Sequence, residues 1–204
     1  MGPVMTLKRF VALLRATVTD PRQAGAEVIA MNWPLQGLWL ALMLAAVLLS
    51  LLTSGLLQLA PLPDDQLGDV LRLSPAYRAP LLFALINWGQ SVVSVLLLHG
   101  IGRLFGSRGA LADVLAVMIW LQVVSLVLAV SLFVVGLALP TIGGVMFLAA
   151  FFWGIWATIG LVDAAGRFDN MLKAAAVCAV ALVAGFVIMT VLSALIGGFA
   201  AQGG

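Results

Sequence analysis

Charge is the scarcest feature of this 204-residue chain, because only 9% of its residues are charged while 64% are apolar. A soluble domain carries charge on about a quarter of its residues, and the mean hydropathy here is +1.20. Ten basic residues against eight acidic ones give a formal net charge of +2, too little for the basic surface that nucleic-acid binding requires. Composition therefore argues against a water-exposed enzyme and a nucleic-acid partner, and it indicates a membrane protein.

Residues that commonly perform chemistry are also few. The chain has one cysteine, Cys178, and one histidine, His99. An internal disulfide is therefore excluded, and no Cys and His cluster has the spacing of a metal site. The sequence contains no nucleophile-elbow, P-loop or zinc-protease motif. We interpret Asp64, Asp65 and Asp69 as part of a solvated loop, and we expect no catalytic residue, no cofactor and no metal.

Long uncharged segments are abundant. Five are long enough to cross a bilayer, which takes roughly 20 helical residues: 34–60, 81–102, 114–139, 145–165 and 174–200. They predict an all-α fold, a polytopic transmembrane bundle over residues 34–204, preceded by a surface segment over residues 1–33. Four prolines over residues 61–80 predict a loop with one short helix, and residues 140–144 predict a tight turn.

The basic residues predict the orientation of the bundle. Five spans place the two termini on opposite sides, and eight of the ten Lys and Arg residues lie on the N-terminal side, with only Arg72 and Arg78 on the other. Basic residues concentrate in cytoplasmic loops, so we expect a cytoplasmic N-terminus and a C-terminus on the opposite side. Eight arginines against two lysines, with abundant Ala, Gly and Leu, favour a GC-rich bacterial source and the cytoplasmic (inner) membrane.

The first 33 residues contain two predicted helices. The first has apolar residues at helical spacing, with basic residues on other faces, which is typical of an amphipathic helix. Its apolar residues are Leu7, Phe10, Val11, Leu14 and Val18, and its candidate lipid-surface contacts are Lys8, Arg9 and Arg15. Asp20, Pro21 and Gln23 predict the start of a second helix that ends near Met31. The first helix either lies in the headgroup layer or packs its apolar face on the bundle.

Polar residues inside or near the spans are candidate site residues, because an ionisable group at the bilayer centre costs roughly 2.5–3.5 kcal/mol. Six of them lie near the predicted cytoplasmic boundary and form a candidate polar collar: His99, Arg103, Arg108, Asp113, Asp163 and Arg167. Deeper in the bundle lie Asn87, Gln90 and Gln122. The collar is either a set of interhelical ion pairs or a ligand or proton site, and the amides are either interhelical hydrogen bonds or substrate ligands.

Small residues four apart predict close contact between spans, because they let helix backbones approach each other. Three such pairs occur in the last two predicted spans: Ala150 with Gly154, Ala175 with Ala179, and Ala181 with Gly185. They serve either internal packing or a partner helix.

Three stretches of the chain resemble the Yip family, five-span membrane proteins named for interaction with Ypt and Rab GTPases. Residues 10–21, ending in Asp20-Pro21, resemble the family's lead-in to span one. Residues 99–106 (HGIGRLFG), followed by residues 111–114 (LADV), are similar to its connection between spans two and three. The segment from Trp156 to Lys173-Ala174 resembles its span-four exit. Arg108 stands where many members keep a second glycine-rich turn.

The resemblance implies a protein defined by its membrane architecture rather than by catalytic residues. We therefore expect it to act through helix, lipid and partner contacts, as an organiser of the membrane or a trafficking-like scaffold. Its expected partners are the lipid bilayer and other membrane proteins or further copies of itself. The alternative is a small-solute or ion transporter or channel, either alone or as an oligomer, that uses the polar groups of spans two to four, with His99 and Asp163 facing the same cavity. A water-filled cavity lined by these groups would favour the alternative.

Overall fold

The computed structural model describes residues 6–59, 62, 64–168 and 170–202, with only the backbone of Pro140 and residues 192–202. This part of the chain folds into nine α-helices and no strand. They are α1 (Leu7–Thr19), α2 (Pro21–Ala30), α3 (Leu35–Leu59), α4 (Gln66–Leu73), α5 (Pro75–Arg78), α6 (Pro80–Leu104), α7 (Leu111–Ala138), α8 (Pro140–Gly166) and α9 (Met171–Gln202). Five of these helices are long and apolar enough to cross a membrane, which confirms the predicted five-span, all-α fold.

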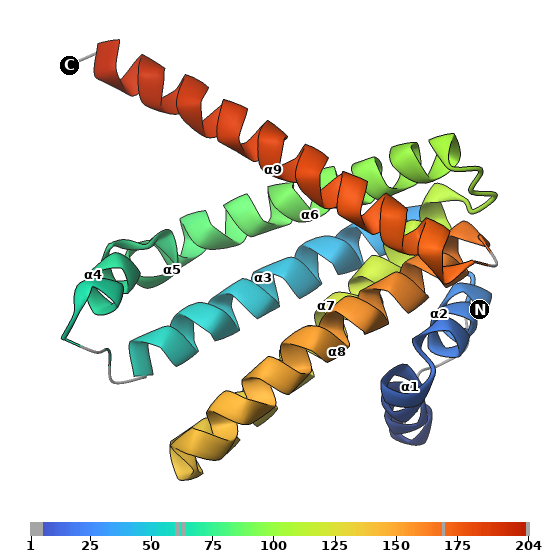
Figure 1. The fold of residues 1–204 in the computed structure, drawn as a ribbon, viewed down its shortest axis with the longest axis horizontal. Helices are drawn as coiled ribbons and strands as arrows, with labels where there is room; N and C mark the ends of the chain where they lie inside the picture. The colour runs from blue at the N-terminus through green and yellow to red at the C-terminus, as the bar shows by residue number, and fades with distance from the viewer. Residues whose placement is uncertain (1–5, 60–61, 63, 169, 203–204) are drawn as a thin grey trace.

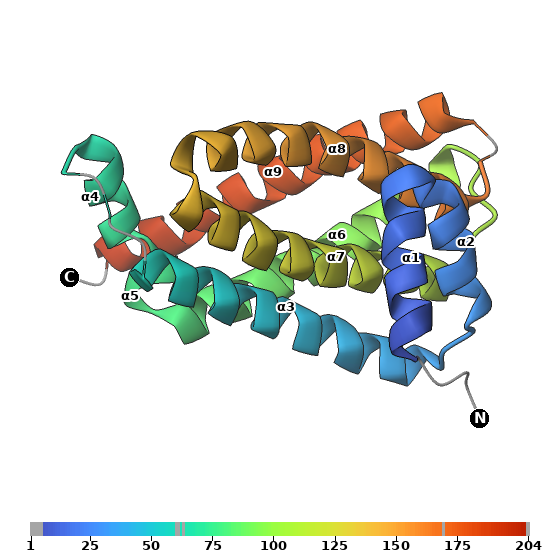
Figure 2. The same cartoon turned by 90° about the horizontal axis from the view of Figure 1, so that it is seen from below.

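The five long helices lie along one another, and the short helices lie at the two ends of the bundle (Figure 1). We call the end with α1 and α2 the α2 end, and the end with α4 and α5 the α4 end. Figure 2 shows α1 running across the long helices rather than along them. Helix α7 packs against α3, α6 and α8, and α9 packs against α6 and α8.

The core of the bundle is concentrated at the α2 end. There, the first turns of α7 are buried on nearly every side, from Val114 to Trp120, because α2, α3 and α8 all pack around them. Toward the α4 end, α8 and α9 diverge (Figures 1 and 2), and large apolar side chains such as Phe147 and Phe186 are exposed. In a bilayer these exposed side chains face hydrocarbon.

The connection between α7 and α8 is shorter than predicted. Residues 140–144 do not form a turn: Pro140 is at the first position of α8, and Leu139 alone separates the two helices. Proline is well suited to this position, because the first N–H of a helix has no partner within the helix. A Cβ on Gly143 would lie 2.6 Å from the Cα of Gly136, so glycine at this position permits the close approach of the hairpin.

The segment between α3 and α6 contains two short helices, one more than predicted. Asp65 caps α4 by accepting a hydrogen bond from the backbone N–H of Gly68 at 2.9 Å. The Arg72 guanidinium pairs with Asp64 at 3.0 Å and with Asp69 at 3.2 Å. The hydrogen bond to Asp64, followed by that to Asp69, raises the pKa of Arg72. One of the two basic residues at the α4 end is therefore held by acidic neighbours.

Candidate functional site

Each of the two N-terminal helices begins at a side chain that caps its first turn. The hydroxyl oxygen of Thr6 accepts a hydrogen bond from the Arg9 N–H at 3.3 Å. Asp20 accepts one from the Gln23 N–H at 3.0 Å, and Pro21 is the first residue of α2. This arrangement confirms the helix start predicted at Asp20 and Pro21, and it fixes the corner between α1 and α2.

One side of α1 is docked on α7. Leu13 and Thr17 are buried, and the indole N–H of Trp120 donates a hydrogen bond to the Thr17 hydroxyl at 2.9 Å. The rings of Phe10 and Trp120 meet edge to face, with their centroids 5.7 Å apart. Neither Leu13 nor Thr17 belongs to the apolar face predicted from the sequence. A threonine contributes little to an apolar periodicity, so its buried position could not be recognised from that pattern.

A second side of α1 is open. Leu7, Val11 and Val18 are 77%, 51% and 58% exposed, and with the partly buried Leu14 they form a stripe at i, i+4, i+7 and i+11. The apolar face predicted from the sequence therefore has two parts: Phe10 contacts α7 on the docked side, and the stripe forms the open side next to it. Lys8, Arg9 and Arg15, the candidate lipid contacts, are exposed on the same helix.

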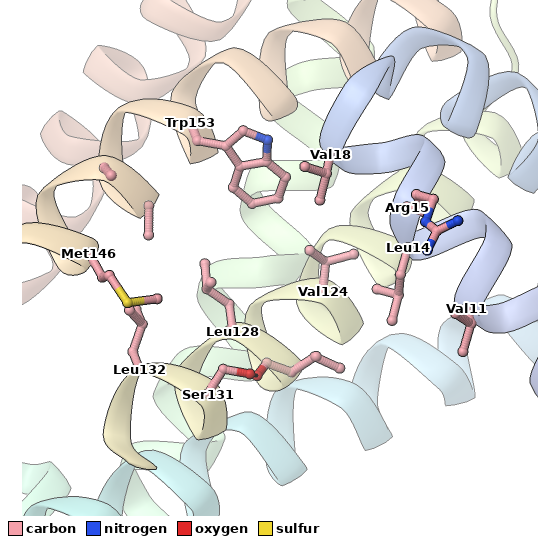
Figure 3. Close-up of a pocket in the computed structure, with 13 residues that line it drawn as sticks. Val11, Leu14, Arg15, Val18, Val124, Leu128, Ser131, Leu132, Met146 and Trp153 are labelled. Carbon is pink, nitrogen blue, oxygen red and sulfur yellow. Dashed lines mark hydrogen bonds between the residues drawn. The ribbon is translucent and has the colours of Figure 1, made fainter. Parts of the chain in front are cut away.

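A groove runs between the open side of α1 and the facing sides of α7 and α8 (Figure 3). Its volume is about 540 Å³. Most of its lining is aliphatic, and Arg15 and Ser131 are polar exceptions. Trp153 of α8 also lines it, and its indole N–H is buried without a hydrogen-bond partner among the described residues. The α1 residues Val11, Leu14 and Val18 form one wall of this groove.

Helix α2 packs closely on α8 through two glycines. A Cβ on Gly25 would lie 2.8 Å from the Cβ of Ala164, and a Cβ on Gly160 would lie 2.7 Å from the Cγ of Pro21. The small-residue pairs predicted from the sequence lie elsewhere, and Gly154 has no heavy atom within 4 Å of the position of a Cβ. Spacing within a span could not identify Gly25, because Gly25 lies on α2, outside the spans, and packs on Ala164 of α8.

Asp163, a member of the candidate polar collar, is paired across this α2–α8 contact. It has no exposed side-chain surface, and its Oδ2 lies 3.1 Å from the Nε of Arg22. Neither carboxylate oxygen accepts a hydrogen bond of good geometry from the described residues. We expected Asp163 to lie beside Arg103, Arg108 and Arg167, but its cation comes from α2.

Two other collar residues, Asp113 and Arg167, form a second ion pair at the start of α7. Asp113 accepts a hydrogen bond from the Ala110 N–H at 3.0 Å and lies 3.4 Å from Arg167. His99 is half-buried on α6, while Arg103 and Arg108 are exposed. The ion pairs described for the collar residues are Arg22–Asp163 and Arg167–Asp113, and they are separate rather than one continuous ring.

The intramembrane amides connect neighbouring spans. Asn87 of α6 donates a hydrogen bond to Ser50 of α3 at 2.8 Å, and Gln122 of α7 donates one to Ser91 of α6 at 2.9 Å. Gln90, the third of the predicted amides, takes no part in these two hydrogen bonds and is exposed on α6. Asn87 and Gln122 therefore lie in the α3–α6–α7 contact, whereas Gln90 lies on the outer surface of the bundle.

The matched region of the chain decides its family. A Yip1 domain model matches residues 15–192, which include the last five residues of α1, all of α2 and the five spans. The chain belongs to the Yip1 domain family. The resemblance noted in the sequence is thereby confirmed. No curated protein and no solved structure matches the chain.

Within the matched region lie Arg15, Arg22, most of the groove and the α3–α6–α7 amides, whereas Lys8, Arg9 and the groove residues Val11 and Leu14 precede it. Yip1 domains are not known as enzymes. Across the described residues, no three His, Cys, Asp or Glu side chains are grouped as a metal ion would require. At its α2 end the chain arranges an amphipathic helix, an ion-paired helix contact and an apolar groove.

Proposed function

We propose that this integral membrane protein works without catalysis, by contacts that its α2 end makes with lipid and with other membrane helices. In this proposal residues 1–33 form a surface segment on the cytoplasmic side of a bacterial inner membrane, and residues 34–204 form the membrane domain. Its role is to organise the membrane around it, as a scaffold for lipids, for other membrane proteins or for further copies of itself.

The observation that carries this proposal is the divided face of α1. One side is held against Trp120 through Phe10 and Thr17, so the helix has a fixed position on the bundle. The other side exposes Leu7, Val11 and Val18 beside basic residues. An apolar stripe flanked by Lys and Arg is suited to the boundary between headgroups and acyl chains.

The intramembrane polar groups favour contact over transport. Asn87 and Gln122 are bonded to serines of adjacent spans, and Asp163 is buried beside Arg22. The large groove is lined mainly by aliphatic side chains, which is a poor path for an ion or a polar solute. The polar groups thus support packing between helices.

Spin-label accessibility tests the proposed position of α1. The full chain carrying Cys178→Ala and either Val11→Cys or Ala12→Cys is labelled and reconstituted into liposomes. Val11 lies on the open apolar stripe, whereas the neighbouring Ala12 is exposed on a different face. We expect the Val11 label to be reached by oxygen and protected from a water-soluble nickel chelate, and the Ala12 label to show the reverse. Equal exposure of both labels to the chelate would refute the proposal.

Solute flux through the same liposomes tests the alternative. Vesicles that contain the protein should release entrapped ions and small solutes no faster than protein-free vesicles. Release that depends on the protein and is lost in Asn87→Leu or Gln122→Leu would establish transport instead.

A further inference from the structure

We propose that the groove between α1, α7 and α8 holds an acyl chain of an anionic phospholipid whose phosphate is bound by Arg15. This inference rests on the proposed function in one respect, the position of α1 at the surface of the bilayer. It adds a defined binding site and a defined class of lipid.

The shape of the groove suits a hydrocarbon chain. Its α7 wall runs from Val124 to Leu132, about 12 Å along the helix axis at 1.5 Å per residue. The α8 wall runs from Met146 to Trp153, and α1 closes the end nearest the α2 end (Figure 3). The groove thus follows the spans, as acyl chains do in a bilayer, and its volume of about 540 Å³ is in the range of ligand sites.

One cationic donor lines the groove. Arg15, on the α1 wall, makes no ion pair with any described residue. The hydroxyl of Ser131, by contrast, already donates to the carbonyl of Val127 at 2.8 Å. The indole N–H of Trp153 has no exposed surface, so a molecule in the groove does not reach it. The phosphate of a lipid in the groove can therefore accept from Arg15.

Charge identifies the lipid. Helix α1 contains Lys8, Arg9 and Arg15 and no acidic residue, so it attracts anionic headgroups over zwitterionic ones. The groove is also continuous with surface that faces hydrocarbon, since Val127 and Met146 line it and remain 37% and 39% exposed. A phospholipid of the surrounding leaflet can therefore enter sideways, with no opening of the bundle.

Lipid retention by the purified full chain tests this site. The protein is exchanged into detergent with equal amounts of phosphatidylglycerol and phosphatidylcholine, and retained lipids are counted by native mass spectrometry. We expect phosphatidylglycerol to be preferred about fivefold, the ratio expected for one basic residue near an anionic headgroup. Arg15→Gln should abolish this preference, whereas Arg9→Gln, which changes an exposed residue outside the groove on the same helix, should keep it. Excess inorganic phosphate should displace nothing, because the chain anchors the lipid.

Two further variants test the apolar part of the site. Ala150→Trp fills the groove and should remove the retained lipid of both kinds, whereas Ala138→Trp, on an exposed part of α7, should not. Thermal unfolding of each variant verifies that it is folded.

The outcomes separate this inference from the proposed function. Wild-type protein without a preference, an equal loss in Arg9→Gln and Arg15→Gln, displacement by inorganic phosphate, or unchanged retention in Ala150→Trp would each overturn the site. If the Val11 label nevertheless lies in hydrocarbon, the surface position of α1 stands and only the groove inference fails.

Discussion

The Nε of Arg22 lies 3.1 Å from the Oδ2 of Asp163, and the two side chains differ sharply in exposure. The arginine side chain is 46% exposed, whereas the aspartate side chain has no exposed surface. A buried carboxylate without a cation is costly, while a half-exposed guanidinium can be hydrated. The pair therefore links α2 to α8, and loss of the arginine should be more costly than loss of the aspartate.

We predict that Arg22→Gln destabilises the protein more than Asp163→Asn. Removing the cation leaves a charge in a buried site and should cost about 1–3 kcal/mol. Removing the carboxylate charge leaves an arginine that water can reach, and it should cost less than about 1 kcal/mol. Thermal or denaturant unfolding in one detergent measures both changes.

The double variant Arg22→Gln with Asp163→Asn provides the matched control for this pair. It should be more stable than Arg22→Gln alone, because the buried charge is gone. Additive losses in the double variant would show that the two residues do not interact.

A second prediction concerns the close contact of α2 with α8. Gly160→Ala should lower stability by about 1–3 kcal/mol, because the new methyl group would meet Pro21 at 2.7 Å. Gly154→Ala is the control on the same helix, with no heavy atom within 4 Å of its Cβ position. It should leave stability unchanged or raise it by up to about 1 kcal/mol. Equal effects of the two substitutions in thermal unfolding would contradict the described contact.

A third prediction concerns the anchoring of α1. Thr17→Val keeps the shape of the side chain but leaves the Trp120 indole N–H without its acceptor, which should cost about 1–3 kcal/mol. Hydrogen exchange should become faster across α1 and change little in α6. Thr17→Ser retains the hydroxyl and should keep the protection of α1. Loss of protection in the Ser variant, with protection kept in the Val variant, would assign the anchoring to the methyl group instead.

A fourth prediction concerns the amides within the spans. Asn87→Leu removes the hydrogen bond to Ser50 and should lower stability by about 0.6–1.7 kcal/mol, the range for such bonds between membrane helices. Gln90→Leu, three residues along the same helix but exposed, should cause no loss, since leucine suits a surface that faces lipid. Ion and solute flux should be unchanged in both variants. A stable Gln90→Leu protein with altered flux would point to a pathway on the outer face of α6.

The number and positions of the spans could be predicted because uncharged length is a one-dimensional signal. The observed long helices begin at Leu35, Pro80, Leu111, Pro140 and Met171, each within a few residues of the prediction. The largest error, at Pro140, came from treating proline and glycine as a turn. In the structure, Pro140 begins α8, and Gly143 packs closely against Gly136 of α7.

The arrangement of the polar residues could not be predicted in the same way. Its predicted depth near the cytoplasmic boundary placed Asp163 with Arg103, Arg108 and Arg167, but the fold brings Arg22 to it from α2. The partners Thr17 and Trp120 are separated by 103 residues, so no local pattern contains their contact. The groove likewise depends on where α1 crosses α7 and α8, a tertiary relationship that helical periodicity does not encode.

The single-residue connection at Leu139 has a consequence for biogenesis. No charged residue lies between Asp113 and Asp163, so the α7–α8 hairpin has no hydrophilic loop that must be carried through the lipid. The two helices can partition into the bilayer as one unit during synthesis, without a translocated segment to slow the step. A protease added on the side of the membrane where Leu139 lies would therefore have no accessible loop to cleave between α7 and α8.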